Sequence, residues 1–191
     1  MLIEKSKERA MYKEFFEKLC ESIGENPNRE GLLKTPQRLE QSHAELFCGY
    51  KQEAKDVFHT TFCEIPYNEM IVIKNVEFYS MCEHHLLPFF GHISIGYIPE
   101  KKIAGISDFA KLIEMYARRL QTQENLTFEI IEALMSELSP KGAMLVCEAT
   151  HLCMAMRGVE KKSSTLLTSA VRGIFKESSK TRAEFLEHIK K

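Results

Sequence analysis

Apolar positions recur at helical spacing through the first third of the chain. Between residues 7 and 23 they appear every three or four positions, and Gly24 follows, a residue type that often ends helices in a left-handed conformation. A second helix is predicted to begin at Thr35 and Pro36, because threonine can cap a helix and proline suits its first turn. The pattern therefore predicts a helical N-terminal region, which we assign to residues 1–65.

From residue 70 the apolar positions follow a shorter period. Residues 70–79 are rich in β-branched and aromatic side chains, and residues 89–97 alternate between apolar and polar ones, so both are predicted strands. Two further strands are predicted over residues 143–156 and 165–175. Two amphipathic helices lie between the strand pairs, and a short helix ends the chain. Each helix has a candidate N-terminal cap, and these caps are Ser107, Thr122 and Thr181.

The predicted order is ββααββ, followed by the terminal helix. Strands that are joined locally in pairs favour antiparallel ladders, with both helices on one face of the sheet. The sequence therefore predicts an α+β domain over residues 66–191.

Composition and charge narrow the class of protein. The chain has 191 residues, of which 44% are hydrophobic and 28% charged, as expected for a globular protein with one domain and a small appendage. The net charge of −1 argues against nucleic acid as a partner. The start lacks the apolar core of a signal peptide, and the most apolar stretch, residues 86–98, is too short to span a membrane. We expect a cytoplasmic protein whose six cysteines are thiols.

Two clusters of cysteine and histidine residues are the candidates for metal binding and catalysis. Cys82 and His85 have a C-x-x-H spacing, which lets one turn present a thiolate and an imidazole to the same metal ion. His151 and Cys153 lie two apart on the predicted third long strand, so their side chains would share a face. Taken singly, each cluster is also explained without a metal, by a buried thiol beside surface or core histidines.

Taken together, the clusters are more specific. Cys82, His85 and Cys153 supply two thiolates and one imidazole, and three protein ligands leave one tetrahedral position open, as catalytic zinc requires. His84 and His151 remain beside the ligands and can transfer protons near neutral pH.

Glu124 and Arg157 are candidate substrate-binding residues. Glu124 lies at the start of a predicted helix and can accept N–H donors from the edge of a guanine, although it can equally stabilise the helix dipole. Arg157 follows the third long strand and suits phosphate, although a solvated loop explains it as well.

At these residues the chain resembles the GTP cyclohydrolase I family. The resemblance rests on four segments, which read REGLLKTPQR (29–38), SMCEHHLLPF (80–89), ARRLQTQE (117–124) and EATHLCMAMRGV (148–159). It implies a tunnelling fold, with a four-stranded antiparallel sheet and two helices on one face. It also implies a toroidal homodecamer with sites at subunit interfaces. The implied reaction converts GTP and water into formate and 7,8-dihydroneopterin triphosphate.

The resemblance also implies a role for each site residue. One zinc ion per subunit is held by Cys82, His85 and Cys153, and its activated water attacks C8 of the purine. His84 and His151 move protons. The residues implied in substrate binding are Glu124 and Gln123 at the guanine, Ser107 near the ribose and phosphates, and Arg157, Lys111 and Arg38 at the triphosphate, with Arg38 from a neighbouring subunit.

One stretch departs from the family. Many members have Ser-Lys-x-x-x-Arg where this chain has Ser107, Asp108 and then Lys111. Lys111 keeps the charge but loses the fork of a guanidinium, and Asp108 is expected to repel triphosphate.

Three alternatives stay open at this stage. A related zinc hydrolase could act on another purine or pterin. A non-catalytic module with structural zinc predicts a fourth protein ligand. A redox-active thiol protein would pair Cys82 with Cys153.

Overall fold

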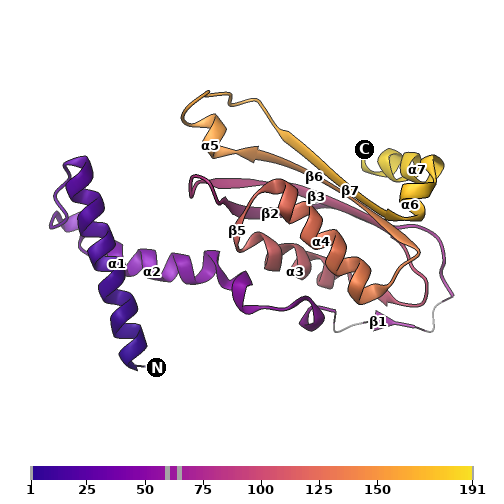
Figure 1. Cartoon of the computed structure of the whole chain (residues 1–191), viewed down its shortest axis with the longest axis horizontal. Coiled ribbons are helices and arrows are strands. Elements are labelled where there is room, and N and C mark those ends of the chain that lie inside the picture. The colour runs from indigo at the N-terminus through magenta and orange to yellow at the C-terminus, as the bar shows by residue number, and fades with distance from the viewer. Residues whose placement is uncertain (1, 59–60, 64–65, 191) are drawn as a thin grey trace. The chain divides into compact units, whose positions relative to one another are not determined.

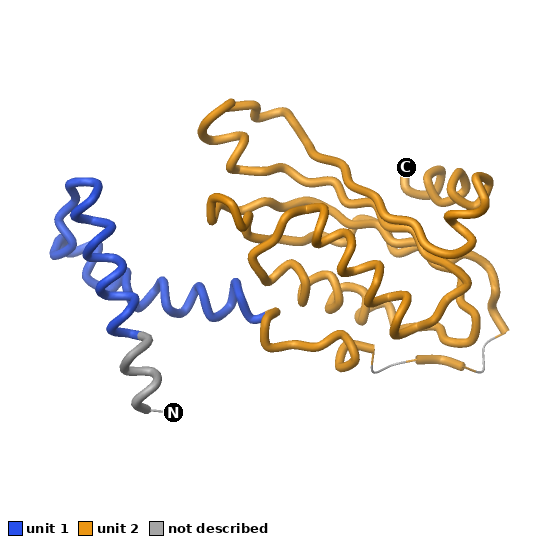
Figure 2. Tube along the Cα trace, in the orientation of Figure 1, with its two compact units in different colours: residues 1–48 blue, residues 49–191 orange. Residues whose placement is uncertain are grey.

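The computed structural model describes residues 2–58, 61–63 and 66–190, with side chains from residue 9 onward. The chain divides into two compact units, residues 1–48 and residues 49–191 (Figure 2). The boundary expected between residues 65 and 66 falls at a residue outside the described ones, so it stays a prediction.

The first unit is helical. Its elements are α1 (Leu2–Ile23), the short 3-10 helix η1 (Glu30–Leu32) and α2 (Thr35–Leu46). Helix α1 buries Phe16 and Cys20, and the Tyr12 hydroxyl lies 3.2 Å from His43 Nδ1 of α2. Thr35 is not the cap of α2, since the cap position belongs to Lys34 and Thr35 is already helical.

The second unit is a mixed α/β structure built on one main sheet. Among the described residues, this sheet has five strands in the order β5-β2-β3-β6-β7. Their bounds are β2 (Ile71–Cys82), β3 (Pro88–Ile98), β5 (Leu120–Gln121), β6 (Gly142–His151) and β7 (Leu166–Gly173). The four long strands are antiparallel to their neighbours, whereas β5 runs parallel to β2. The resemblance implies a sheet of four strands, whereas the described main sheet has β5 as a fifth. Two short strands, β1 (Thr61–Phe62) and β4 (Ile103–Ala104), form a separate ladder.

Helices cover both faces of the main sheet (Figure 1). The bounds of the helices in this unit are α3 (Ile106–Ala117), α4 (Gln123–Leu138), α5 (Leu152–Ala155), α6 (Ile174–Glu177) and α7 (Ser179–Ile189), with 3-10 turns η2 (Cys48–Lys51) and η3 (Ala54–Asp56) near its start. The bare ββααββ order is interrupted by β4, β5 and α5.

Strand β6 shows how the two faces are filled. Alternate residues of the strand belong to different apolar clusters, because successive side chains point to opposite faces of a sheet. Leu145 and Cys147 are fully buried in the main core with α3 and α4. Met144 packs in a second cluster with Phe175 and Phe185 of α6 and α7. Within the described part of the chain, no helix combines the length and apolar character needed to cross a bilayer.

The helix caps match the sequence only in part. Thr122 caps α4 as predicted, since its hydroxyl oxygen accepts the Asn125 N–H at 3.1 Å. Ser107 does not cap α3, because Gly105 holds that position. The cap of α7 is Ser178, whose hydroxyl accepts the backbone N–H of Thr181.

Candidate metal centre

A tight turn between β2 and β3 carries the first two metal-ligand candidates. Cys82 is the last residue of β2, and the following turn contains His85. The turn is closed by two backbone hydrogen bonds of 2.9 Å, from the Cys82 N–H to the Leu87 carbonyl and from the Leu86 N–H to the Cys82 carbonyl. Leu86 has a left-handed φ of 52°, which is costly for a branched side chain and marks a conformation that the surrounding structure enforces.

The turn is anchored to β5. The Glu83 N–H donates to the Gln121 carbonyl at 3.0 Å, directly after the pairing of Cys82 with Gln121 in the parallel ladder. Gln121 is itself buried, and its amide nitrogen donates to the Tyr116 carbonyl at 3.1 Å and to Glu129 at 2.6 Å. The start of the turn that carries Cys82 and His85, which we call the metal turn, is therefore held in place by its hydrogen bonds to β5.

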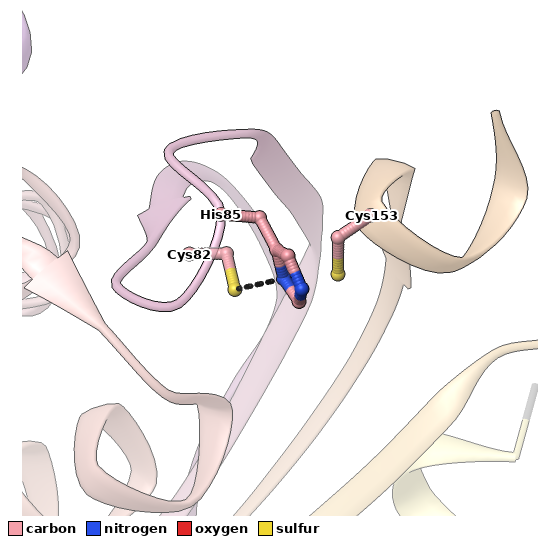
Figure 3. Close-up of side chains that lie close together, drawn as sticks. All are labelled: Cys82, His85 and Cys153. Carbon is pink, nitrogen blue, oxygen red and sulfur yellow. Dashed lines mark hydrogen bonds between the residues drawn. The ribbon is translucent and has the colours of Figure 1, made fainter. Parts of the chain in front are cut away.

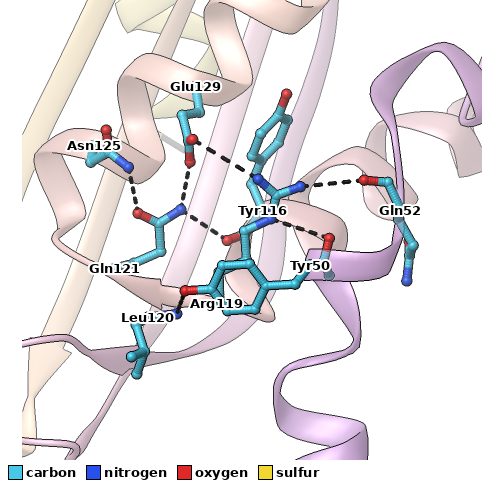
Figure 4. Close-up of polar contacts among 9 residues, drawn as sticks. Tyr50, Gln52, Tyr116, Arg119, Leu120, Gln121, Asn125 and Glu129 are labelled. Carbon is cyan, nitrogen blue, oxygen red and sulfur yellow. Dashed lines mark hydrogen bonds and ion pairs between the residues drawn. The ribbon is translucent and has the colours of Figure 1, made fainter.

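Arg119 connects β5 to the start of the second unit (Figure 4). Its guanidinium lies 4.7 Å from the Tyr116 ring centroid and 5.8 Å from that of Tyr50. It also donates to the Gly49 carbonyl at 3.2 Å, while the Leu120 N–H donates to the Tyr50 hydroxyl at 3.1 Å. We call this set, with Gln121 and Glu129, the Arg119 brace.

The third candidate ligand comes from a different element than the sequence predicts. Strand β6 ends at His151, and Cys153 lies on the short helix α5, not on a strand that continues to residue 156. The prediction that His151 and Cys153 share one face of a strand is therefore wrong. The helical turn instead directs the Cys153 thiol toward the turn that carries Cys82 and His85 (Figure 3).

The three side chains are close enough to share one ion. The ligand atoms of Cys82, His85 and Cys153 all lie within 4.8 Å of one another, and Cys82 Sγ is 3.8 Å from His85 Nδ1. Tetrahedral zinc with bonds of about 2.0–2.3 Å needs ligand atoms about 3.5–3.8 Å apart. Among the described residues, no fourth cysteine, histidine or carboxylate joins the group. The donor set can therefore hold a metal ion with one position left for solvent or substrate.

The electrostatics of Cys153 agree with a metal site. Burial raises the pKa of the Cys153 thiol, the neighbouring Cys82 raises it further, and Arg157 opposes this to a smaller extent. A cation bound between the two sulfur atoms would stabilise the Cys153 thiolate that its surroundings otherwise disfavour.

His151 is fixed beside the group. Its ring stacks on Phe89, with centroids 4.6 Å apart and planes 5° from parallel. Its Nε2 lies 2.8 Å from Oε1 of Gln123. Burial lowers the pKa of His151, and the nearby Glu124 carboxylate partly offsets this. The ring is therefore disposed to be neutral and immobile before it meets a substrate.

His84 has a different environment. Its side chain is exposed on the metal turn, 3.6 Å from Glu83, and its ring centroid lies 6.2 Å from that of His85.

The substrate residues expected in the second unit lie at three places. Glu124 is exposed in the first turn of α4 and borders a pocket of about 440 Å³, which Arg172 and Lys176 also line. Ser107 and Lys111 are exposed one turn apart on α3. Arg157 is exposed just after α5.

Asp108, which is expected from the sequence to repel triphosphate, is buried at the start of α3. Its side chain is 1% exposed, and it accepts a hydrogen bond of 3.0 Å from Lys111. The anion therefore acts first on Lys111, whose charge it compensates. Arg38 lies on α2 of the first unit and is exposed there.

Comparison with known proteins identifies the family to which the chain belongs. The family model described as GTP cyclohydrolase I matches residues 12–190. The chain belongs to the GTP cyclohydrolase I family. GTP cyclohydrolase 1 of Wolinella succinogenes is 56% identical over 168 residues, which cover 88% of this chain and 90% of that protein. GTP cyclohydrolase 1 of Helicobacter pylori is 52% identical, with 92% of this chain and 98% of that protein covered.

A solved structure is more distant. An archaeosine synthase QueF-like protein in the apo form has a TM-score of 0.43 and 17% identity, covering 58% of this chain and 97% of that one. This likeness is too weak to bear on the fold. Membership of the GTP cyclohydrolase I family makes the chain an enzyme whose family acts on GTP.

The sequence does not predict two contacts of this site. Gln123 was expected beside a guanine, yet it is buried and bonds to His151. Phe89 was expected only as a strand residue, yet it stacks on the same ring. The contact of Phe89 with His151 follows from the register of β3 against β6, which pairs these two residues. The hydrophobic pattern of the sequence does not determine that register.

Proposed function

We propose that the chain hydrolyses GTP to formate and 7,8-dihydroneopterin 3′-triphosphate, the first step toward folate-type pterins, with zinc at Cys82, His85 and Cys153. The observation that carries the proposal is the group of two thiols and one imidazole within 4.8 Å, in a chain of this family. Two sulfur ligands and one nitrogen ligand suit zinc better than magnesium or calcium, which prefer oxygen. When bound, zinc supplies Lewis acidity that brings the pKa of water toward neutrality.

The proton transfers are assigned to the two remaining histidines. Opening the imidazole ring of the purine requires that the attacking water loses a proton and that N7 gains one. An imidazole can do both near neutral pH. His151 is supported by its fixed ring two residues before Cys153, and His84 by its exposed position on the metal turn.

The substrate contacts belong to the same proposal. Glu124 accepts the N–H donors of the guanine, and Ser107 lies toward the ribose and phosphates. The triphosphate is assigned to Arg157, Lys111 and Arg38, the last from a neighbouring subunit. The exposure of Glu124, Ser107, Lys111 and Arg157 on the second unit supports their access to a ligand.

The assembly completes the proposal. We infer a tunnelling fold and a toroidal homodecamer with sites at subunit interfaces, in a cytoplasmic protein whose catalytic part is residues 66–191. The antiparallel long strands support the fold, and the open edge of β7 supports contacts between subunits.

The test is the loss of a ligand. Replacing Cys153 by serine, Cys153→Ser, is expected to lower the metal content from one ion per chain to near zero. Formate release from GTP is expected to fall about a thousandfold, which corresponds to several kcal/mol of lost transition-state stabilisation. The matched control is Cys63→Ser, because Cys63 is exposed and lies outside the ligand group.

Metal analysis and formate yield are measured on the same samples. Wild-type protein that holds one metal ion but releases no formate from GTP would indicate another substrate or a non-catalytic module. Cys153→Ser protein with full metal content would show that the ligand assignment is wrong.

A further inference from the structure

We infer that Gln123 is a positioning residue that fixes the proton of the His151 ring on Nε2 and leaves Nδ1 as the nitrogen that exchanges protons with the substrate. The role in turnover rests on the proposed function, whereas the state of the ring does not. The inference replaces the guanine contact expected for Gln123.

A closed set of hydrogen bonds fixes the direction of each donor around Gln123. The Thr127 hydroxyl lies 2.8 Å from the Gln123 backbone carbonyl, which can only accept, so Thr127 donates there. The Thr168 hydroxyl lies 2.6 Å from that of Thr127 and therefore donates to it. Thr168 has then used its proton and can only accept from the Gln123 amide nitrogen, at 3.2 Å.

Two backbone carbonyls reinforce the orientation of the amide. The Gln123 Nε2 atom lies 3.0 Å from the carbonyl oxygens of both Cys147 and Leu166. Turning the amide over would bring its oxygen against these two acceptors and the Thr168 hydroxyl. The amide oxygen must therefore face the opposite direction, where His151 Nε2 lies at 2.8 Å. An amide oxygen only accepts, so His151 Nε2 carries the hydrogen.

With the hydrogen on Nε2 held by Gln123, Nδ1 is the ring nitrogen that stays available to other groups. Stacking on Phe89 fixes the plane of the ring, and the bond to Gln123 fixes its rotation within that plane. Gln123 is 1% exposed and has both ends of its amide engaged, which leaves neither end for a base. It therefore serves His151 in the way that an outer hydrogen-bond partner orients a working imidazole.

The first measurement uses the unaltered protein loaded with zinc. Solid-state ¹⁵N spectra of histidine-labelled protein distinguish protonated from unprotonated ring nitrogens, and the His151 signals are identified by their absence in His151→Asn. We expect a protonated Nε2 and an unprotonated Nδ1. A neutral ring with the proton on Nδ1 would overturn the inference, whatever the enzyme does with GTP.

The second measurement separates positioning from substrate contact. Gln123→Met keeps the length of the side chain but cannot accept a hydrogen bond, and with saturating zinc its kcat is expected to fall about 10- to 100-fold. KM for GTP is expected to stay within about twofold. A higher KM with unchanged kcat would mean that Gln123 contacts the base and would overturn the inference.

The matched control is Ser94→Ala. Ser94 is another buried polar side chain of the main sheet, and its hydroxyl bonds to the Asn75 backbone N–H and not to His151. Its kcat is expected to stay within about threefold of wild type. An equal loss in both variants would mean a general loosening and would also overturn the inference. Absence of formate from the wild type would instead contradict the proposed function and leave the spectroscopic result standing.

Discussion

Cys147 is a buried thiol at the centre of β6 and lies outside the group of candidate metal ligands. Burial raises its pKa from the usual 9.0 to about 12, although the neighbouring polar side chains of Thr168, Thr127 and Gln123 oppose the rise. A thiol with so high a pKa remains protonated and unreactive at neutral pH. It contributes to packing in the main core.

This thiol makes stability depend on pH in the alkaline range. The folded pKa is above the unfolded one, so its contribution is complete below pH 9 and is lost as the pH rises toward 12, by about 1.4 kcal/mol per pH unit for one proton. Denaturant unfolding at pH 8 and pH 10.5 measures the loss. In Cys147→Ala this part of the pH dependence is expected to vanish; an unchanged dependence would contradict the assignment.

The ion pair with Asp108 reduces the positive charge that Lys111 presents to the phosphates of a substrate. Asp108→Asn keeps the shape but removes the anion 3.0 Å from the lysine, so KM for GTP is expected to fall about two- to fivefold at low salt and less at high salt. Glu114→Gln is the control, since it removes an anion paired with Arg118 on the same helix. Equal changes in the two variants would show that the effect is not local to Lys111.

At the scale of elements, the Arg119 brace holds β5 against the segment that starts at Gly49. Arg119→Lys keeps the charge but loses the planar group that stacks on Tyr116, so the free energy of unfolding is expected to fall by about 1–2 kcal/mol. Arg118→Lys changes the neighbouring residue, whose side chain bonds to Glu114, and is expected to cost less than about 0.5 kcal/mol. Chemical denaturation compares the two; similar losses would contradict a special role for Arg119.

The elements that the sequence predicted are the long ones. Strands β2, β3, β6 and β7 and helices α3 and α4 have sustained apolar periods, so their existence follows from the pattern. Strand β5 has two residues, too few for any period, and it exists because it pairs with the end of β2. The end of β6 was missed because residues 152–155 remain apolar, which suits a strand or a helical turn equally well.

At the scale of the whole molecule, the site assembles from distant parts of the chain. Cys82 and His85 could be paired from their spacing, since one turn carries both. Cys153 could be proposed from its residue type beside His151, but the sequence does not give its approach to the other two, which depends on the β3–β6 register and on α5. The role inferred for Gln123 depends on carbonyls from β6 and β7, and the sequence alone does not place them around one amide.

The sheet also leaves edges open. Strand β7 has β6 as its one neighbour in the main sheet, and β5 pairs only with the last two residues of β2, as far as the described residues show. Unpaired edges of this length are usually covered in natural proteins. The arrangement is consistent with the proposed ring, in which neighbouring copies cover them.

The distance along the chain between the ligands has a thermal consequence. Residues 82 and 153 are 71 positions apart (153 − 82), so an ion held by both would act as a reversible crosslink around α3 and α4. A covalent bridge over a segment of that length lowers the entropy of the unfolded chain by an amount worth about 4 kcal/mol. Chelation is therefore expected to lower the melting temperature of the second unit by several degrees, as calorimetry would show, and re-addition of zinc to restore it. Melting that ignores the chelator would mean that no ion joins these segments.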